Sequence, residues 1–152
     1  KKVDIVIEAF NKLGLPLVVV GTGPEEASLR KSAASNIVFR GFVEDDELAT
    51  LYRGARALIF PSEEDFGMTA AEALSFGTPV IAFEYGGIRE IMESGVSGEL
   101  FAAQTPEILA EGVRRFLLRE GTYDEARMKQ SVERFGKGRF QKELGKFVEE
   151  HS

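Results

Sequence analysis

The sequence predicts an α/β fold in which helices cover both faces of a parallel sheet. Short apolar runs of strand length alternate with amphipathic helical segments along the chain. Strands separated by helices form βαβ units, and right-handed crossovers then produce a doubly wound sheet. With 152 residues, the chain is long enough to bury a core as a single domain.

Five apolar runs are the expected strands. The first, residues 17–20 (Leu-Val-Val-Val), is continuously apolar, which is typical of a strand buried on both faces. The other expected strands cover residues 37–39, 57–60 and 79–83, with a short edge strand at 98–101.

Loops that could bind a ligand follow the first four of these strands. Ligands of doubly wound sheets bind at the carboxyl ends of the strands. We therefore expect four loops on the same edge of the sheet, at residues 21–23, 41–43, 62–67 and 85–87.

Eight helices are expected around the strands. Several have recognisable ends, such as Pro24 near the start of one helix and Gly14 and Gly77 just after others. One of them contains Glu72 and ends at Gly77; the others cover residues 3–10, 25–32, 44–52, 88–93, 106–118, 123–133 and 139–149.

The chain opens directly with a helix, whereas a Rossmann-like sheet normally begins with a strand that becomes central. We therefore expect one domain, residues 1–152, that is truncated on its N-terminal side and lacks its first strand.

Composition excludes several classes of protein. The chain has 25 acidic and 19 basic residues and a net charge of −6, which argues against a nucleic-acid partner. It contains no cysteine, so disulfides and thiolate metal sites are excluded. There is neither an apolar run long enough to span a bilayer nor a signal-peptide pattern. These features favour a cytoplasmic protein.

Two glutamates form the most informative pattern. Glu64 is expected in a loop just after a strand, and Glu72, eight positions later, lies inside the following helix. Each carboxylate can accept hydrogen bonds from two neighbouring hydroxyls, and free amides at a helix N-terminus attract phosphate. The spacing therefore suits a polyhydroxylated ligand that carries phosphate. The alternative is an acidic solvated loop followed by an ordinary helical glutamate.

The segment around these glutamates resembles a known family. Residues 60–73 read FPSEEDFGMTAAEA, followed by Gly-Thr-Pro-Val-Ile-Ala at 77–82 and two glycines at 86–87. This combination resembles the C-terminal domain of retaining glycosyltransferases of the GT-B architecture, and most closely the glycosyltransferase group 1 family. The resemblance covers essentially the whole chain. It implies that the chain is one Rossmann-like half of a GT-B protein.

The resemblance also implies roles for individual residues. Glu64, the catalytic candidate, would accept hydrogen bonds from the hydroxyls of the donor sugar. Glu72 would accept hydrogen bonds from the two ribose hydroxyls of the nucleotide. The backbone amides that contact the sugar and the diphosphate would be those of Phe66, Gly67, Met68 and Thr69.

Further binding residues carried over from the family each have a simpler alternative. Lys1 matches a lysine that contacts the diphosphate, or is an ordinary terminal lysine. Gly21 and Gly23 match a glycine-rich turn that lines the nucleotide site, or form a plain turn. Val43 belongs to the segment whose backbone reads the base, or to a strand–helix corner packed by Phe42.

As a whole, the resemblance implies a domain that binds a nucleotide-diphosphate sugar. The full-length protein would transfer a hexose to a glycan or lipid-linked acceptor, whereas the isolated fragment would be inactive without the missing N-terminal acceptor domain. The Glu-Glu-Asp-Phe-Gly-Met-Thr form resembles mannosyltransferases, so GDP-mannose is the suggested donor. No metal or other cofactor is expected, and the acids at 45–46 are interpreted as a helix cap. The expected location is cytoplasmic, with peripheral attachment to the inner membrane face through the missing domain as an alternative.

Two alternative functions stay open. The first is a non-catalytic module that binds a nucleotide sugar or a protein partner. The second is a sugar-nucleotide epimerase of GT-B architecture, which would carry histidines in its pocket; the only histidine here is His151, in the C-terminal tail.

The last predicted helix, at residues 139–149, has an apolar stripe. Exposed stripes of this kind usually mark an interface. We therefore expect the isolated fragment to self-associate through this helix or to leave it mobile. The stripe consists of Phe140, Leu144, Phe147 and Val148.

Overall fold

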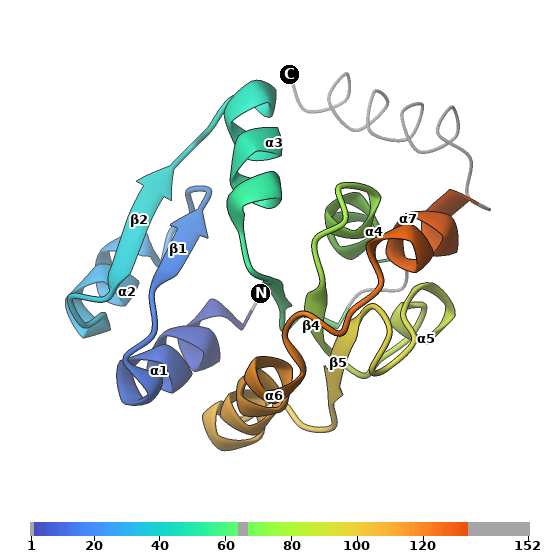
Figure 1. The fold of residues 1–152 in the computed structure, drawn as a ribbon. Coiled ribbons are helices and arrows are strands. Elements are labelled where there is room, and N and C mark those ends of the chain that lie inside the picture. Colours follow the sequence, from blue (N-terminus) through green and yellow to red (C-terminus); the bar gives the residue numbers. More distant parts are fainter. Residues whose placement is uncertain (1, 64–66, 134–152) are drawn as a thin grey trace.

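The computed structural model describes residues 2–63 and 67–133. Over these residues, strands and helices alternate as predicted (Figure 1). The strands are β1 (Leu17–Val20), β2 (Ile37–Gly41), β3 (Leu58–Phe60), β4 (Val80–Phe83) and β5 (Gly98–Phe101). The helices are α1 (Val3–Leu13), α2 (Glu26–Ser32), α3 (Asp45–Gly54), α4 (Met68–Ser75), α5 (Ile88–Ile91), α6 (Pro106–Arg119) and α7 (Glu125–Glu133). The predicted helix at 139–149, with its apolar stripe, lies outside the described residues.

The strands form two parallel sheets instead of one continuous sheet. β1 pairs with β2, and β3, β4 and β5 form a second sheet in that order. In the doubly wound order 3-2-1-4-5-6, one further strand would lie between β1 and β3. The division between the sheets therefore falls between β1 and β3, where this order places one further strand. The four expected loops therefore do not follow strands of one single sheet. The loops at 21–23 and 41–43 follow the strands of the first sheet, and the loops at 62–67 and 85–87 follow strands of the second.

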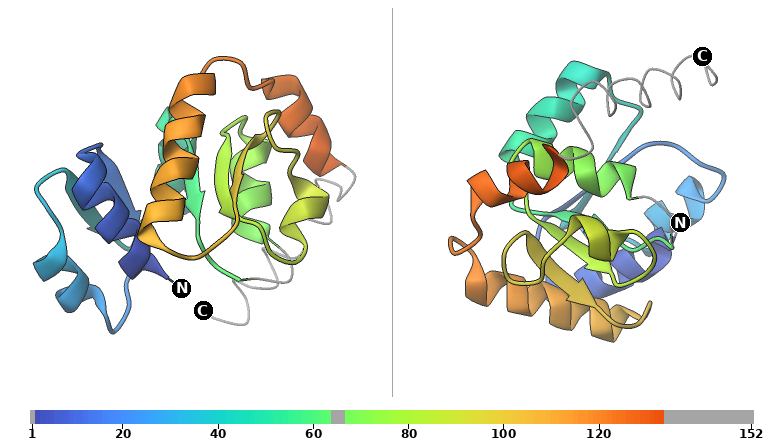
Figure 2. Two further views of the ribbon diagram at one scale, coloured as in Figure 1. Left: turned by 90° about the horizontal axis from the view of Figure 1, so that it is seen from below. Right: turned by 90° about the vertical axis from the view of Figure 1, so that its right-hand side faces the viewer.

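A shared helical layer joins the two sheets. α1 contacts both β2 and α6, and α6 contacts β4 and β5 (Figure 2). The apolar side chains of this layer form one core with residues from both sheets, including Ile7, Phe10, Ile37, Ile81 and Phe101. α4 packs on β3, β4 and α7, so the second sheet has helices on both faces.

The prediction that β1 is buried on both faces is wrong. Its burial alternates, with Leu17 and Val19 packed against the α1–α6 core. Val18 and Val20 on the other face are 45% and 40% exposed, and Val38 of β2 is 50% exposed. A continuous apolar run indicates burial on both faces only where helices cover both faces. Within the described residues, α1 packs on one face of this sheet and the valine face stays accessible.

Glycines determine two kinds of local geometry. Gly14 and Gly77 end α1 and α4 in the left-handed conformation, with φ of 71° and 75°, as predicted. Gly98 allows β5 to approach β4 closely, because it lies opposite Val80 with a φ of 144°. A Cβ atom at Gly98 would lie 1.8 Å from the carbonyl oxygen of Val80.

Candidate functional site

Helix α4 has one buried face and one accessible face. Ala70, Ala71, Ala73 and Leu74 are at most 1% exposed and pack into the core. The accessible residues follow helical spacing along the opposite face, as expected for positions i, i+3 and i+4. They are Met68, Thr69, Glu72 and Ser75. Three of the residues assigned to ligand binding therefore share this one surface.

The N-cap residue of α4 has no side chain that could cap the helix. Gly67 is the N-cap residue, and its carbonyl accepts a hydrogen bond from the Ala71 amide at 2.8 Å. Amides in the first turn of a helix have no partner within the helix and attract anions. The structure adds a second reason for glycine at position 67, because a Cβ atom there would lie 3.0 Å from Cδ1 of Ile88.

Glu72 lies at the boundary between solvent and core. The Tyr52 hydroxyl of α3 donates a hydrogen bond to Oε2 of Glu72 at 3.5 Å. Burial raises the pKa of Glu72, the Tyr52 hydrogen bond opposes this, and the negative charge of Asp45 raises the pKa further. The sequence analysis did not single out Tyr52, because its position is consistent with an ordinary apolar contact of α3.

The turn after β1 and the corner after β2 lie together at the end of the smaller sheet. The Gly21 amide donates a hydrogen bond to the Gly41 carbonyl at 2.7 Å, and the Gly23 carbonyl accepts one from the Glu26 amide. Val43, in the corner, is half-buried. Phe42 is 75% exposed, so the alternative in which Phe42 packs this corner is wrong.

The corner after β2 is also linked to the surface of α4. Asp45 opens α3 two residues after Val43, and its charge acts on Glu72. Asp45, two residues after the predicted base-binding segment, is thus near enough to the predicted ribose-binding carboxylate to affect its pKa.

Three predicted site residues lie outside the described residues: Lys1, Glu64 and Phe66. The segment that follows β3 and leads to Glu64 contacts another loop through Pro61. Nε2 of Gln104, which follows β5, donates a hydrogen bond to the carbonyl of Pro61 at 2.8 Å. The roles assigned to Glu64 and its neighbours stay predictions.

The acidic start of α3 is not a side-chain cap. Glu44 is the N-cap residue and makes no capping hydrogen bond through its side chain. Asp45, Asp46 and Glu47 follow in the first turn, where the helix dipole favours negative charge. In the described part of the chain, no group of three or more histidines and acids is arranged to hold a metal ion.

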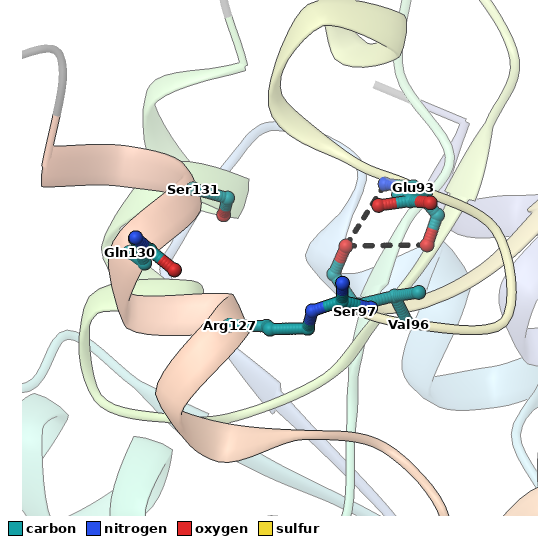
Figure 3. Close-up of a pocket in the computed structure, with 6 residues that line it drawn as sticks. All are labelled: Glu93, Val96, Ser97, Arg127, Gln130 and Ser131. Carbon is teal, nitrogen blue, oxygen red and sulfur yellow. Dashed lines mark hydrogen bonds between the residues drawn. The ribbon is translucent and has the colours of Figure 1, made fainter.

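A hollow of about 230 Å³ lies elsewhere, between α7 and the segment before β5 (Figure 3). Its lining contains none of the predicted site residues. The Ser97 hydroxyl in it accepts a hydrogen bond from the Glu93 amide at 2.9 Å and donates one to the Glu93 carbonyl at 3.3 Å. Local backbone bonding therefore accounts for this hydroxyl, and we place the candidate site at α4.

None of the described helices has the length and apolar character needed to cross a membrane.

Comparison with known proteins finds a match to a protein family. A family model described as "Glycosyl transferases group 1" matches residues 1–135. The chain is 34% identical over 130 residues to the O-antigen chain mannosyltransferase C of Escherichia coli. That alignment covers 80% of this chain and 35% of the relative, so the chain spans about a third of the relative's length.

Solved structures share the fold. The chain is similar to the apo form of the lipopolysaccharide outer core galactosyltransferase WaaB, with a TM-score of 0.77, 19% identity and coverage of 100% of this chain and 46% of that one. It is also similar to the pneumococcal O-GlcNAc transferase GtfA in complex with UDP and GlcNAc, with a TM-score of 0.70 and 26% identity. That comparison covers 97% of this chain and 32% of the other.

Proposed function

The chain belongs to the glycosyl transferases group 1 family, and on this premise we propose that it binds the nucleotide-diphosphate-sugar donor of a retaining glycosyltransferase. The observation that carries the proposal is the accessible face of α4. There, a helix N-terminus that begins at a glycine and the half-buried Glu72 carboxylate occupy one surface. This combination suits a ligand with a diphosphate at one end and a vicinal diol at the other.

Each part of the donor has a proposed partner. Glu72 accepts hydrogen bonds from the ribose hydroxyls, and the amides at the start of α4 bind the diphosphate with help from Lys1. Glu64 and the amides of residues 66–69 hold the sugar. Val43 and the turn at Gly21 and Gly23 line the base and the nucleotide.

In the proposed reaction, the chain stabilises the leaving nucleoside diphosphate. The bond between the anomeric carbon and the phosphate oxygen breaks, and a bond from that carbon to an acceptor hydroxyl forms on the same face. The proton of the acceptor hydroxyl passes to the leaving phosphate. The amides of α4 oppose the charge that develops on that phosphate.

The full-length protein is proposed to contain an N-terminal domain that binds the acceptor, a glycan or a lipid-linked sugar. The similarity to a mannosyltransferase supports GDP-mannose as the donor. We propose that the reaction needs no metal ion, and that the protein is cytoplasmic or attached to the inner membrane face through the acceptor domain.

Calorimetric titration of the full-length protein with a panel of nucleotide sugars tests this proposal. One conjugate, expected to be GDP-mannose, should bind, and its bare nucleoside diphosphate should bind at the same site. A free hexose phosphate without the nucleoside should bind far more weakly, because it lacks the ribose diol. Binding without turnover in the presence of acceptors would favour a non-catalytic module, and isomerisation of the bound sugar would favour an epimerase.

A further inference from the structure

The hydroxyl of Tyr52 reaches the Glu72 carboxylate from another helix. Tyr52 lies near the end of α3, and Glu72 lies in the middle of α4. The distance from Oη to Oε2 is 3.5 Å, which is a long hydrogen bond. Within the described part of the chain, Tyr52 is the one side chain that donates a hydrogen bond to this carboxylate. The contact involves one of the two carboxylate oxygens, Oε2.

Packing holds the Tyr52 ring in place. The residue is 7% exposed, and its ring stacks on Phe76 with centroids 5.6 Å apart and planes inclined by 18°. The hydroxyl of the buried Thr78 donates a hydrogen bond to the Tyr52 carbonyl at 2.6 Å. Both the ring and the backbone of Tyr52 are therefore fixed to the segment that follows α4.

The hydrogen bond from Tyr52 also affects the pKa of Glu72. Burial is the largest cause that raises the pKa of Glu72, and the Tyr52 hydrogen bond is the cause that lowers it. The pKa of Tyr52 lies well above its ordinary value because of burial and the charge of Glu72, so the phenol remains protonated and can donate.

The helices around α4 carry other charged groups, which either raise the pKa of Glu72 or contact residues other than Glu72. Asp45 at the start of α3 is negative and raises the pKa of Glu72. The guanidinium of Arg53 lies over the Phe76 ring at 5.0 Å. On α7, Lys129 pairs with Glu125 at 2.9 Å. Among these described neighbours, the Tyr52 hydroxyl is the group whose hydrogen bond lowers the pKa of Glu72.

We propose that Tyr52 is a positioning residue, which anchors one oxygen of Glu72 so that the carboxylate presents its remaining acceptor positions to a vicinal diol. This inference rests on the proposed function, which places the nucleotide ribose at Glu72. It adds a second helix to the site, because α3 then controls how α4 binds the nucleotide.

The test is Tyr52→Phe in the full-length protein, with UDP and GDP titrated by calorimetry between pH 5 and pH 8. We expect an affinity loss of about threefold to tenfold, below that of a short hydrogen bond to a charged group. The pH profile should also move. Removing a hydrogen bond to the ionised carboxylate raises its pKa, so the loss of affinity on acidification should begin at a higher pH in the variant. Because both proteins meet the same nucleotide, the titration of the nucleotide itself cancels in the comparison.

Tyr123→Phe is the matched control. The Tyr123 hydroxyl also donates to a carboxylate, at 2.8 Å to Oε2 of Glu99, which belongs to β5 and contacts Arg115 and Arg119 of α6. This variant loses the same chemical group, and we expect it to leave both the nucleotide affinity and the pH profile unchanged. A merely structural role for Tyr52 would lower the melting temperature without moving the acidic midpoint, and that result would overturn the inference.

A double variant separates this inference from the proposed function. If Tyr52 acts through Glu72, then Tyr52→Phe should cause no further loss of affinity in a Glu72→Gln background. If Glu72→Gln leaves affinity unchanged, the proposed function fails. If Glu72→Gln weakens binding and Tyr52→Phe adds its loss independently, only the positioning role fails.

If Tyr52→Phe does not fold, carbon NMR of the parent protein provides the test. The carbon shifts of the Glu72 carboxyl and of the Tyr52 ring should change with pH around one shared midpoint, and separate midpoints would overturn the inference.

Discussion

At the scale of single residues, small side chains on one face of α4 make the other face available. Three alanines of α4 are at most 1% exposed, so the helix packs closely on the core and leaves Glu72 on its accessible face. Burial raises the pKa of Glu72, and a hydrogen bond to its ionised form opposes that rise. A ligand diol would supply such bonds, so we expect binding of the ribose hydroxyls to lower the pKa of Glu72.

The same residues show how far sequence reasoning reaches. The i, i+3 and i+4 spacing is enough to place Met68, Thr69 and Glu72 on one face of a helix. The Tyr52 contact is not predictable in this way, because its partner is 20 positions away in the sequence and on another helix. Only tertiary packing brings the two groups together.

At the scale of elements, the close approach of β5 to β4 depends on Gly98. We expect Gly98→Ala to destabilise the protein by more than the roughly 1–3 kcal/mol that a strained backbone conformation costs. The new Cβ atom would lie 1.8 Å from the Val80 carbonyl oxygen, so a strand would have to move. Urea denaturation would measure the loss.

Gly121→Ala is the control for this change. Gly121 also has a positive φ, of 90°, but nothing lies within 4 Å of a Cβ atom there. It should show the conformational cost alone. Equal losses in the two variants would contradict the steric role of Gly98.

Element types and turns follow well from local sequence, whereas sheet burial does not. Gly14 and Gly77 end helices because only a left-handed residue can complete those turns, which is a local requirement. The exposure of Val18 and Val20 depends instead on which elements cover the sheet. A run of four apolar residues contains no information about that cover, so the prediction of burial on both faces failed.

At the scale of the whole molecule, the two sheets share one helical layer, and β1 and β3 each have one edge that pairs with no strand among the described residues. Amides in a parallel strand alternate between its two sides. The amides of Leu17 and Gly21 bond to the β2 side, and the amide of Leu58 bonds to the Pro79 carbonyl on the β4 side. The amides of Val18, Val20 and Ile59 therefore face away from their paired strands.

We expect a further parallel strand to pair with both edges in the full-length protein. Hydrogen exchange by NMR would then show slow exchange at Val18, Val20 and Ile59, comparable to exchange at Val19. Fast exchange at these three amides beside a slow Val19 would show that the edges stay open, and the domain would then have a divided sheet in its native context.

The central claim is that Glu72 binds the nucleotide and Glu64 binds the sugar. Calorimetry of Glu72→Gln in the full-length protein, with Glu111→Gln of α6 as the control, tests it most directly. Losing a charged acceptor of two hydroxyls should cost roughly 1.5–3 kcal/mol of binding free energy for the bare nucleoside diphosphate and the nucleotide sugar alike. Glu64→Ala should weaken only the sugar conjugate, and the control should weaken neither. Unchanged nucleotide affinity in a folded Glu72→Gln protein would contradict the account.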